Sequence, residues 1–234
     1  FNGLNWRLIT TSNKAVVRSL AKDENGRIYA GALGEVGYLT PDSLGKMEYE
    51  SLLPVIPKEE RSFNNMWDIY IAKNAIYTVS FSGLYIFPKD VPNSKSKVKV
   101  IHPTKDKLFH RGFLVNDVMY MREWEKGLMK LNGDSLEMVP GGDFFANERI
   151  YGMVPFGNDQ ILIATRTKGL MIYDGKQFTP WRTDLTPFLV KAEIYSARLL
   201  ENKYYVITTL NAGVLILDLK GNPVQLINQA KGLL

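Results

Sequence analysis

The sequence predicts an all-β fold, and three observations predict it. A glycine followed by a short apolar run recurs five times, at Gly37, Gly83, Gly127, Gly169 and Gly213. These glycines are 46, 44, 42 and 44 residues apart. A β-rich run and a polar turn precede each glycine, and aromatic residues, which pack well on a pleated sheet, make up 12% of the chain. The repeat predicts one strand-rich unit of about 44 residues, used five times.

Each unit has the pattern strand, tight turn, strand, loop, strand, turn, strand. First strands are expected at 16–20, 66–70, 112–114, 150–154 and 194–197, second strands at 28–30, 76–79, 118–121, 161–164 and 205–208, and fourth strands at 47–52, 98–101, 136–139, 178–181 and 224–227. The third strand of each unit follows its glycine. No segment shows a convincing amphipathic helix pattern.

Four short antiparallel strands in about 44 residues match one blade of a β-propeller. One such sheet cannot bury both faces, so neighbouring blades must stack. A β-sandwich would also contain short strands, but it predicts no fixed period. We therefore predict one propeller segment over residues 1–234, with blade repeats at about 10–52, 63–102, 109–140, 147–182 and 191–228.

The two ends of the sequence suggest that the five blades are part of a larger propeller of about seven. Phe1–Trp6 is similar to the fourth-strand segment Asp174–Phe178, so residues 1–9 are expected to form the outer strand of a preceding blade. Residues 229–234 are expected to be a connector into another blade. An open arc of blades would expose two apolar faces, so self-association or a homodimer is an expected partner state.

Composition excludes several classes of function. The net charge is +5, and the densest cationic run, Lys95, Lys97 and Lys99, alternates with Ser96 and Val98 as one solvated strand face would, so no nucleic-acid contact is expected. With no cysteine and two histidines, no metal site is expected, and no cofactor motif is present. No run of 18 apolar residues could span a membrane, so membrane attachment would need segments outside this sequence.

Three pieces of the chain, 22–31, 165–178 and 209–222, resemble the two-component regulator propeller repeat. Asp23, Gly26, Tyr29 and Gly31 match the first part of its pattern, with Tyr29 where the family commonly has Trp. The later part is matched by Thr165, Gly169 and Asp174 in repeat four and by Thr209, Gly213 and Asp218 in repeat five. Repeats two and three depart from the pattern, because their turns are shorter and lack the Asp–Gly pair. Residues 34–52 also resemble the first blades of such regulators in Bacteroidetes.

The resemblance implies a function. In that family the propeller is the periplasmic sensor part of an inner-membrane regulator, followed by a triple-tyrosine domain, a membrane helix and an output domain. Several members sense oligosaccharides. The resemblance therefore implies an extracytoplasmic, ligand-sensing propeller that takes part in signal transduction and control of transcription and binds a carbohydrate.

A ligand is expected on the loops that join strands two and three of a blade, and strand four to the next blade, because these loops share one face of the scaffold. Sugar rings stack on aromatic side chains, and their hydroxyls bond to planar polar groups. The candidate residues on this face are Asn64, Asn65, His110, Arg111, Arg122, Glu123, Trp124, Arg149, Arg166, Lys168 and Asn211. Trp124 is the foremost candidate; alternatively it covers the rim of blade three, and the charges are simply solvated. Trp67 is expected to pack between blades.

Two other functions remain open. The chain could be a protein-interaction scaffold, with binding spread over one face. It could also be a lyase or glycosidase, in which Glu123, Glu125 or Glu148 would supply an acid–base pair. An enzyme is the less favoured of the two, because no catalytic motif is present.

Overall fold

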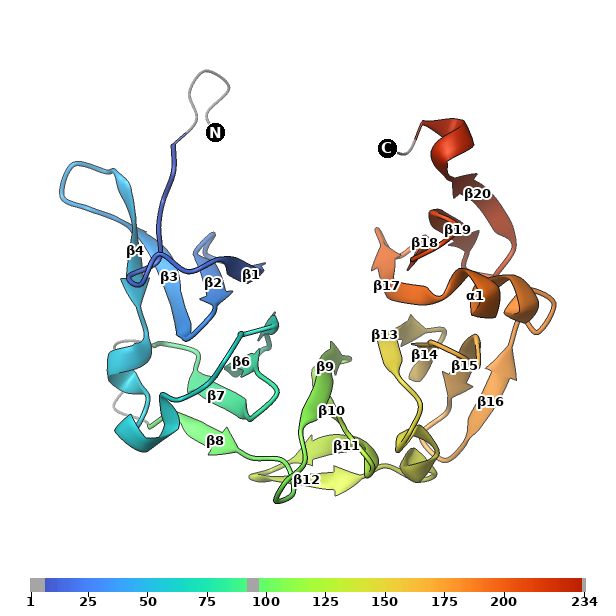
Figure 1. Ribbon diagram of the computed structural model, residues 1–234, viewed down its shortest axis with the longest axis horizontal. Coiled ribbons are helices and arrows are strands. Elements are labelled where there is room, and N and C mark those ends of the chain that lie inside the picture. Colours follow the sequence, from blue (N-terminus) through green and yellow to red (C-terminus); the bar gives the residue numbers. More distant parts are fainter. Residues whose placement is uncertain (1–6, 92–96, 233–234) are drawn as a thin grey trace. The chain divides into compact units, whose positions relative to one another are not determined.

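The computed structural model describes residues 7–91 and 97–232, and it contains five four-stranded antiparallel sheets. Each sheet is formed by four consecutive strands, so the predicted all-β propeller of five four-stranded blades is confirmed. Figure 1 shows the sheets coloured in chain order. The segment Phe1–Trp6, expected to be an outer strand, lies outside the described residues, and residues 7–9 form no strand.

Blades 1 and 2 precede residue 102. Blade 1 comprises β1 (Val17–Lys22), β2 (Ile28–Ala32), β3 (Glu35–Pro41) and β4 (Met47–Ser51). Blade 2 comprises β5 (Asp68–Ile71), β6 (Ala75–Val79), β7 (Leu84–Pro88) and β8 (Lys99–Ile101). Two short 3-10 helices, η1 (Leu53–Val55) and η2 (Lys58–Glu60), connect the two blades.

Blades 3 to 5 follow in the same strand order. Blade 3 comprises β9 (Phe109–Val115), β10 (Val118–Glu123), β11 (Gly127–Asn132) and β12 (Ser135–Met138); blade 4 comprises β13 (Ile150–Phe156), β14 (Gln160–Thr165), β15 (Leu170–Tyr173) and β16 (Phe178–Trp181); blade 5 comprises β17 (Ile194–Leu200), β18 (Tyr204–Thr209), β19 (Val214–Asp218) and β20 (Pro223–Ile227). The connectors contain η3 (Gly142–Phe145) and α1 (Thr186–Ala192), and η4 (Gln229–Lys231) follows β20.

The helix α1 is a feature that the sequence did not predict. It has seven residues and a proline in its first turn. Backbone N–H groups in the first turn have no partner within the helix, so the N–H that proline lacks is not needed there. Leu189 and Ala192 are its buried residues, and Glu193, at a φ of 55°, ends it. Two buried positions are too few to give an amphipathic pattern, because such a pattern emerges only over several turns.

The chain divides into two compact units, residues 1–111 and 112–234, with the division inside β9. In the first unit one apolar core lies between blades 1 and 2 and includes Tyr29, Met66 and Phe87. The second unit has one core with residues of blades 3 and 4 and another with residues of blades 4 and 5. Each face of a blade in these cores is buried against its neighbour, as stacked sheets require.

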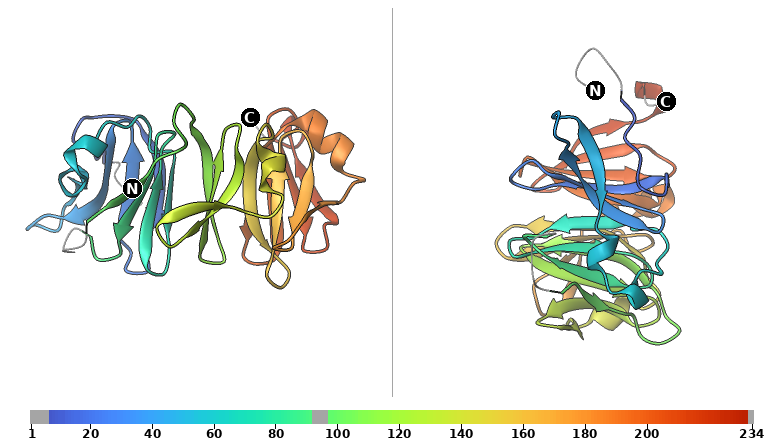
Figure 2. Two further views of the ribbon diagram at one scale, coloured as in Figure 1. Left: turned by 90° about the horizontal axis from the view of Figure 1, so that it is seen from below. Right: turned by 90° about the vertical axis from the view of Figure 1, so that its left-hand side faces the viewer.

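Within each blade the turns lie at the two ends of the strands (Figure 2). We call the loops that join strands two and three, and the connectors between blades, the upper loops; the other turns are the lower turns. An aspartate closes four of the lower turns by accepting two backbone N–H bonds, and these residues are Asp23, Asp42, Asp174 and Asp218. Local side-chain bonds of this kind fix a turn without tertiary support.

The upper loops of blades 4 and 5 are closed by a threonine four residues before the repeat glycine. The Thr165 hydroxyl donates to the Gly169 carbonyl and accepts from the N–H of Lys168. The Thr209 hydroxyl bonds Gly213 and Ala212 in the same way. This shared bond explains why threonine and glycine keep a constant spacing in the repeat.

The inner strands of blades 4 and 5 pack closely. A Cβ atom added at Gly152 of β13 would lie 2.6 Å from Cβ of Ala197 in β17. Only glycine leaves room for this approach, and it brings the upper ends of β13 and β17 side by side.

Candidate functional site

A β-bulge at the upper end of the first strand occurs in blades 1, 4 and 5. The strand register skips one residue in each case, and the skipped residues are Arg18, Tyr151 and Tyr195. A bulge removes its residue from the alternation of the strand and re-aims the side chain. At this position in three repeats, the bulge sets the direction of the side chain, and the regular alternation of the strand does not.

In the second unit this position forms an aromatic pair. The rings of Tyr151 and Tyr195 stack with centroids 6.0 Å apart and an interplanar angle of 30°. Tyr195 is 51% exposed. Beside the pair, the hydroxyls of Ser196 and Thr208 bond each other at 2.8 Å. An exposed aromatic ring with hydroxyls beside it can receive an amphipathic ligand.

Charged groups border the tyrosines. Arg166 Nη2 donates to Glu193 Oε2 at 2.8 Å, and this bond is the first cause that raises the pKa of Arg166. The negative charge of Glu148 acts on Arg166 in the same direction but more weakly. Glu193 directly precedes β17, so the ion pair lies close to Tyr195 in the chain.

Arg122 is a buried structural residue rather than an exposed loop residue as predicted. It belongs to β10, is fully buried, and donates from Nε to Phe145 O at 3.0 Å and from Nη2 to Ala146 O at 2.6 Å. Its Nη1 has no hydrogen-bond partner within the described part of the chain. Burial first, and the nearby Arg149 second, lower the pKa of Arg122 to about 10.

Trp124 is half-buried against two guanidinium groups. Arg122 Cζ lies 3.8 Å, and Arg149 Cζ 5.2 Å, from the centroid of its ring. Both distances allow cation–π attraction. This packing favours the alternative in which Trp124 covers the rim of blade 3, since much of its surface is already in contact with protein.

Glu123 was also predicted on a loop, and it too is buried. It ends β10, is 1% exposed, and lies 3.7 Å from the Lys126 ammonium. A carboxylate in the loop before β13 is likewise engaged, since Glu148 accepts bonds from the N–H and the hydroxyl of Thr167. These two carboxylates therefore hold loops in place.

The remaining predicted residues of the second unit do lie on upper loops. Lys168 and Asn211 are exposed, and Arg149 and Arg166 are half-buried. The N–H of Asn211 bonds Ala192 O and that of Leu210 bonds Glu193 O, so the β18–β19 loop is fixed against the end of α1. We call Tyr151, Arg166, Glu193, Tyr195 and Asn211 the tyrosine platform.

In the first unit, Asn64 and Asn65 lie on the connector before blade 2, whereas His110 and Arg111 do not lie on a loop. Both belong to β9, which starts three residues earlier than predicted. Arg111 Nη1 donates to Asp68 Oδ1 at 3.1 Å. The strand was predicted from the apolar residues Phe113 and Leu114. The polar pair His110 and Arg111 at its start shows no apolar–polar alternation, so the first residues of the strand were missed.

Trp67 contacts both its own blade and the preceding one, as expected for packing between blades. Its ring stacks on Phe81 with centroids 5.4 Å apart and an angle of 27°, and Arg18 Cζ lies 5.6 Å from its centroid. Arg18 Nε also donates to Asn65 Oδ1 at 3.2 Å.

Tyr151, Tyr195, Arg18 and Phe81 were not predicted as site residues. A signal was present for the tyrosines, since Ile-Tyr begins the first strand in both repeat four and repeat five. It could not be used because alternation along a strand does not show that one residue is bulged.

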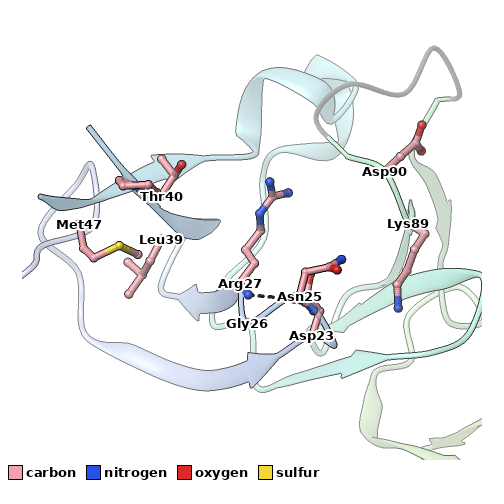
Figure 3. Close-up of a pocket in the computed structure, with 10 residues that line it drawn as sticks. Asp23, Asn25, Gly26, Arg27, Leu39, Thr40, Met47, Lys89 and Asp90 are labelled. Carbon is pink, nitrogen blue, oxygen red and sulfur yellow. Dashed lines mark hydrogen bonds between the residues drawn. The ribbon is translucent and has the colours of Figure 1, made fainter. Parts of the chain in front are cut away.

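A pocket of about 500 Å³ lies at the lower turns of the first unit. In Figure 3, Leu39 and Met47 lie on one side and Lys89 and Asp90 on the other. The Lys89 ammonium already bonds Glu24 and Ala72 O, and the Arg27 guanidinium bonds Val91 O and covers the Tyr38 ring. The cations of this pocket therefore hold the turns of two blades together.

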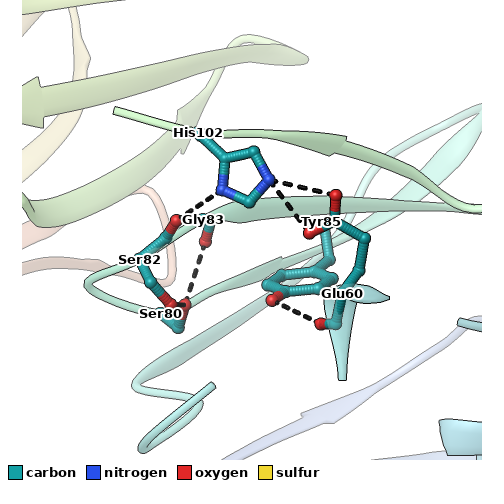
Figure 4. A network of polar contacts seen from close by, with 6 residues as sticks. All are labelled: Glu60, Ser80, Ser82, Gly83, Tyr85 and His102. Atoms are coloured by element: carbon teal, nitrogen blue, oxygen red, sulfur yellow. Dashed lines mark hydrogen bonds and ion pairs between the residues drawn. The ribbon is translucent and has the colours of Figure 1, made fainter. Parts of the chain in front are cut away.

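A second polar network joins η2 to the outer edge of blade 2 (Figure 4). His102 directly follows β8; its Nδ1 lies 3.0 Å from Ser82 O, and its Nε2 lies 2.9 Å from Glu60 Oε2. The bond to Glu60 is the first cause that raises the pKa of His102. Since both neighbours are acceptors, the doubly protonated imidazolium fits this position best.

Over residues 7–91 and 97–232, no group of three or more His, Asp or Glu side chains could hold a metal ion. In the same described residues, no helix is long and apolar enough to cross a membrane.

Comparison with known proteins identifies the fold alone. No family model matches the sequence, and no curated protein matches it. Several solved structures are similar. The WD40 domain of Neurospora crassa Pan2 is 11% identical with a TM-score of 0.63, covering 93% of this chain and 67% of that domain. Virginiamycin B lyase from Staphylococcus aureus is 8% identical with a TM-score of 0.64, covering 92% and 71%. YCF48 bound to D1 peptide is 15% identical with a TM-score of 0.63, covering 92% and 67%.

These similarities extend over nearly the whole of this chain. They agree with a β-propeller, a fold compatible with binding either a ligand or a protein partner.

Proposed function

We propose that this chain is the ligand-sensing propeller portion of a membrane-bound, two-component-type regulator, exposed to the periplasm, and that its ligand is an oligosaccharide. The resemblance of its repeats to the regulator propeller repeat suggests the class of protein. The tyrosine platform suggests the ligand, and the half-exposed ring of Tyr195 is the observation that carries this proposal.

The physical case rests on matching surfaces. One face of a pyranose ring presents C–H groups, which pack against an aromatic ring, and its edge presents hydroxyls. Tyr195 and Tyr151 supply the ring surface, while Arg166 and Glu193 supply a planar donor and a planar acceptor at its border. A few polar groups around an apolar floor are typical of small-ligand sites.

We propose binding without turnover. Glycoside hydrolysis needs two carboxyl groups about 5–10 Å apart at the scissile bond. Glu123 is buried and Glu148 is held by Thr167, so of the three candidate carboxylates only Glu125 is exposed and no pair is presented to a substrate. No catalytic residue is therefore assigned.

We also propose that the five blades are part of a larger propeller of about seven. The outward face of blade 5 carries exposed apolar side chains, including Leu200, Tyr204 and Val224. The similar structures are longer, since this chain covers 67–71% of their length. A further blade stacked on this face would bury those side chains; a second copy of the chain could bury them as well.

A thermal-shift panel tests the proposed ligand. Full-chain protein is melted alone and with plant and host oligosaccharides. A ligand at about 100 times its Kd stabilises the protein by about 2.7 kcal/mol, which is about 5–10 °C for a chain of this size. A selective shift is expected in the wild type and in Tyr204→Ala, and it should disappear in Tyr195→Ala.

The two tyrosine variants are matched, because both remove a partly exposed ring from blade 5. A glycan that raises the melting temperatures of wild type and Tyr195→Ala equally would show that the ligand does not bind at the tyrosine platform. No shift with any glycan would overturn the proposed carbohydrate ligand.

A further inference from the structure

The upper loops of the first unit expose a row of large apolar side chains. Val16, Leu33, Phe81 and Leu108 are 64%, 50%, 38% and 49% exposed. Backbone bonds connect the loops that carry them: Leu33 bridges Asn65, and Phe109 N–H donates to Phe81 O. We call Val16, Leu33, Trp67, Phe81 and Leu108 the upper ridge. Exposed apolar side chains that gather on neighbouring loops of a folded protein can form an interaction site.

The centre of the upper ridge is rigid. Trp67 and Phe81 are stacked, and the N–H of Trp67 donates to Val79 O, which fixes it to its own blade. The indole Nε1 is buried and has no hydrogen-bond partner among the described residues. Aromatic side chains that are already ordered lose little entropy on binding, and they dominate protein interfaces.

A cation borders this centre. Arg18 is exposed, its bulge directs it toward Trp67, and within the described part of the chain its side chain donates to the neutral side chain of Asn65. The two nearby carboxylates have other partners: Asp68 pairs with Arg111, and Glu60 contacts His102. Among the described residues no ion pair involves Arg18, so its positive charge lies next to apolar surface.

From these observations we propose that the upper ridge binds an extended peptide segment of a protein partner, with large apolar side chains flanking a carboxylate. The apolar groups would cover Leu33 and Phe81, and the carboxylate would pair with the Arg18 guanidinium. This surface lies in a different unit from the tyrosine platform and goes beyond the proposed function. A peptide is favoured because the exposed surface beside Arg18 is made of large apolar side chains.

Labelled peptide pools test the proposal by fluorescence anisotropy with the full chain. Three degenerate octapeptide pools carry Leu or Phe on both sides of a fixed Glu, Gln or Lys. The glutamate pool should bind about three- to tenfold more tightly than the glutamine pool, as one charge-assisted hydrogen bond predicts. The lysine pool should bind weakest of the three.

Two variants locate the site. Arg18→Gln should reduce binding of the glutamate pool to that of the glutamine pool, and Leu33→Ser should weaken both. Arg198→Gln removes another exposed arginine, on blade 5, and should change neither. The proposal is overturned if no pool binds, if the glutamate and glutamine pools bind equally to wild type, or if Arg198→Gln has the same effect as Arg18→Gln.

Discussion

Arg122 illustrates how a charged residue can be part of the scaffold. Its guanidinium holds the carbonyls of Phe145 and Ala146, at the end of η3, and lies over the Trp124 ring. Gly127 allows the start of β11 to pack closely against η3, since a Cβ there would lie 2.2 Å from Gly142 O. Strand β10, its upper loop and η3 are thus packed together around one buried cation.

Replacing Arg122 should cost stability rather than ligand affinity. Arg122→Ala leaves two buried carbonyls without donors, and the expected loss is about 3 kcal/mol in the free energy of unfolding. Arg149→Ala is the matched control, because it contacts the same Trp124 ring from a half-buried position and should cost below about 1 kcal/mol. Urea unfolding measures both, and equal costs would contradict the structural role of Arg122.

The contrast between Arg122 and the repeat glycines shows what the sequence could predict about residues. Three of the repeat glycines, Gly127, Gly169 and Gly213, have positive φ values, and the even spacing of all five located the blades. Arg122 and Glu123 stand in a polar run and were expected in solvent. Their burial depends on η3 packing over them, a tertiary contact that no local pattern reveals.

Among the elements, η2 and the end of β8 are joined by His102. Because bonding to Glu60 raises the folded-state pKa of this histidine, the bond stabilises the protein fully below the unfolded-state pKa of about 6.5. The stabilisation is lost as the pH rises through the higher folded-state value.

We therefore expect the melting temperatures of wild type and His102→Gln to differ most at about pH 5–6 and to converge above neutral pH. Thermal melts across pH 5–9 give the difference directly. Glu60→Gln should reproduce the loss in the same pH window. A difference that is constant with pH, or that grows toward alkaline pH, would show that the imidazolium–carboxylate contact does not stabilise the protein.

Strands were more predictable than their irregularities. The period of about 44 residues predicted twenty strands in five sheets, and the structure has them. Each of the bulges at Arg18, Tyr151 and Tyr195 inserts one residue into a strand. The inserted residue is of a type that also occurs in regular strands, so the sequence does not reveal the bulge. For this reason the predicted site contained Arg166 and Asn211 but lacked the two aromatic side chains beside them.

At the scale of the chain, repetition supplies the scaffold and departures from it supply chemistry. Blades 1, 4 and 5 share one bulge position, yet it carries arginine in one blade and tyrosine in two. The same backbone device therefore presents a cation in the first unit and an aromatic pair in the second. The two surfaces that we propose for recognition thus differ in chemistry although they belong to one repeated fold.

Amide hydrogen exchange of the full chain, with and without the oligosaccharide that gives the largest thermal shift, tests whether the upper loops of blades 4 and 5 form the ligand site. We predict slower exchange at 149–152, 166–168, 193–196 and 209–211, with little change at the lower turns near 157–160 and 200–203. Protection confined to the lower turns, or to blades 1 and 2, would contradict the assignment of the tyrosine platform as the sensing site.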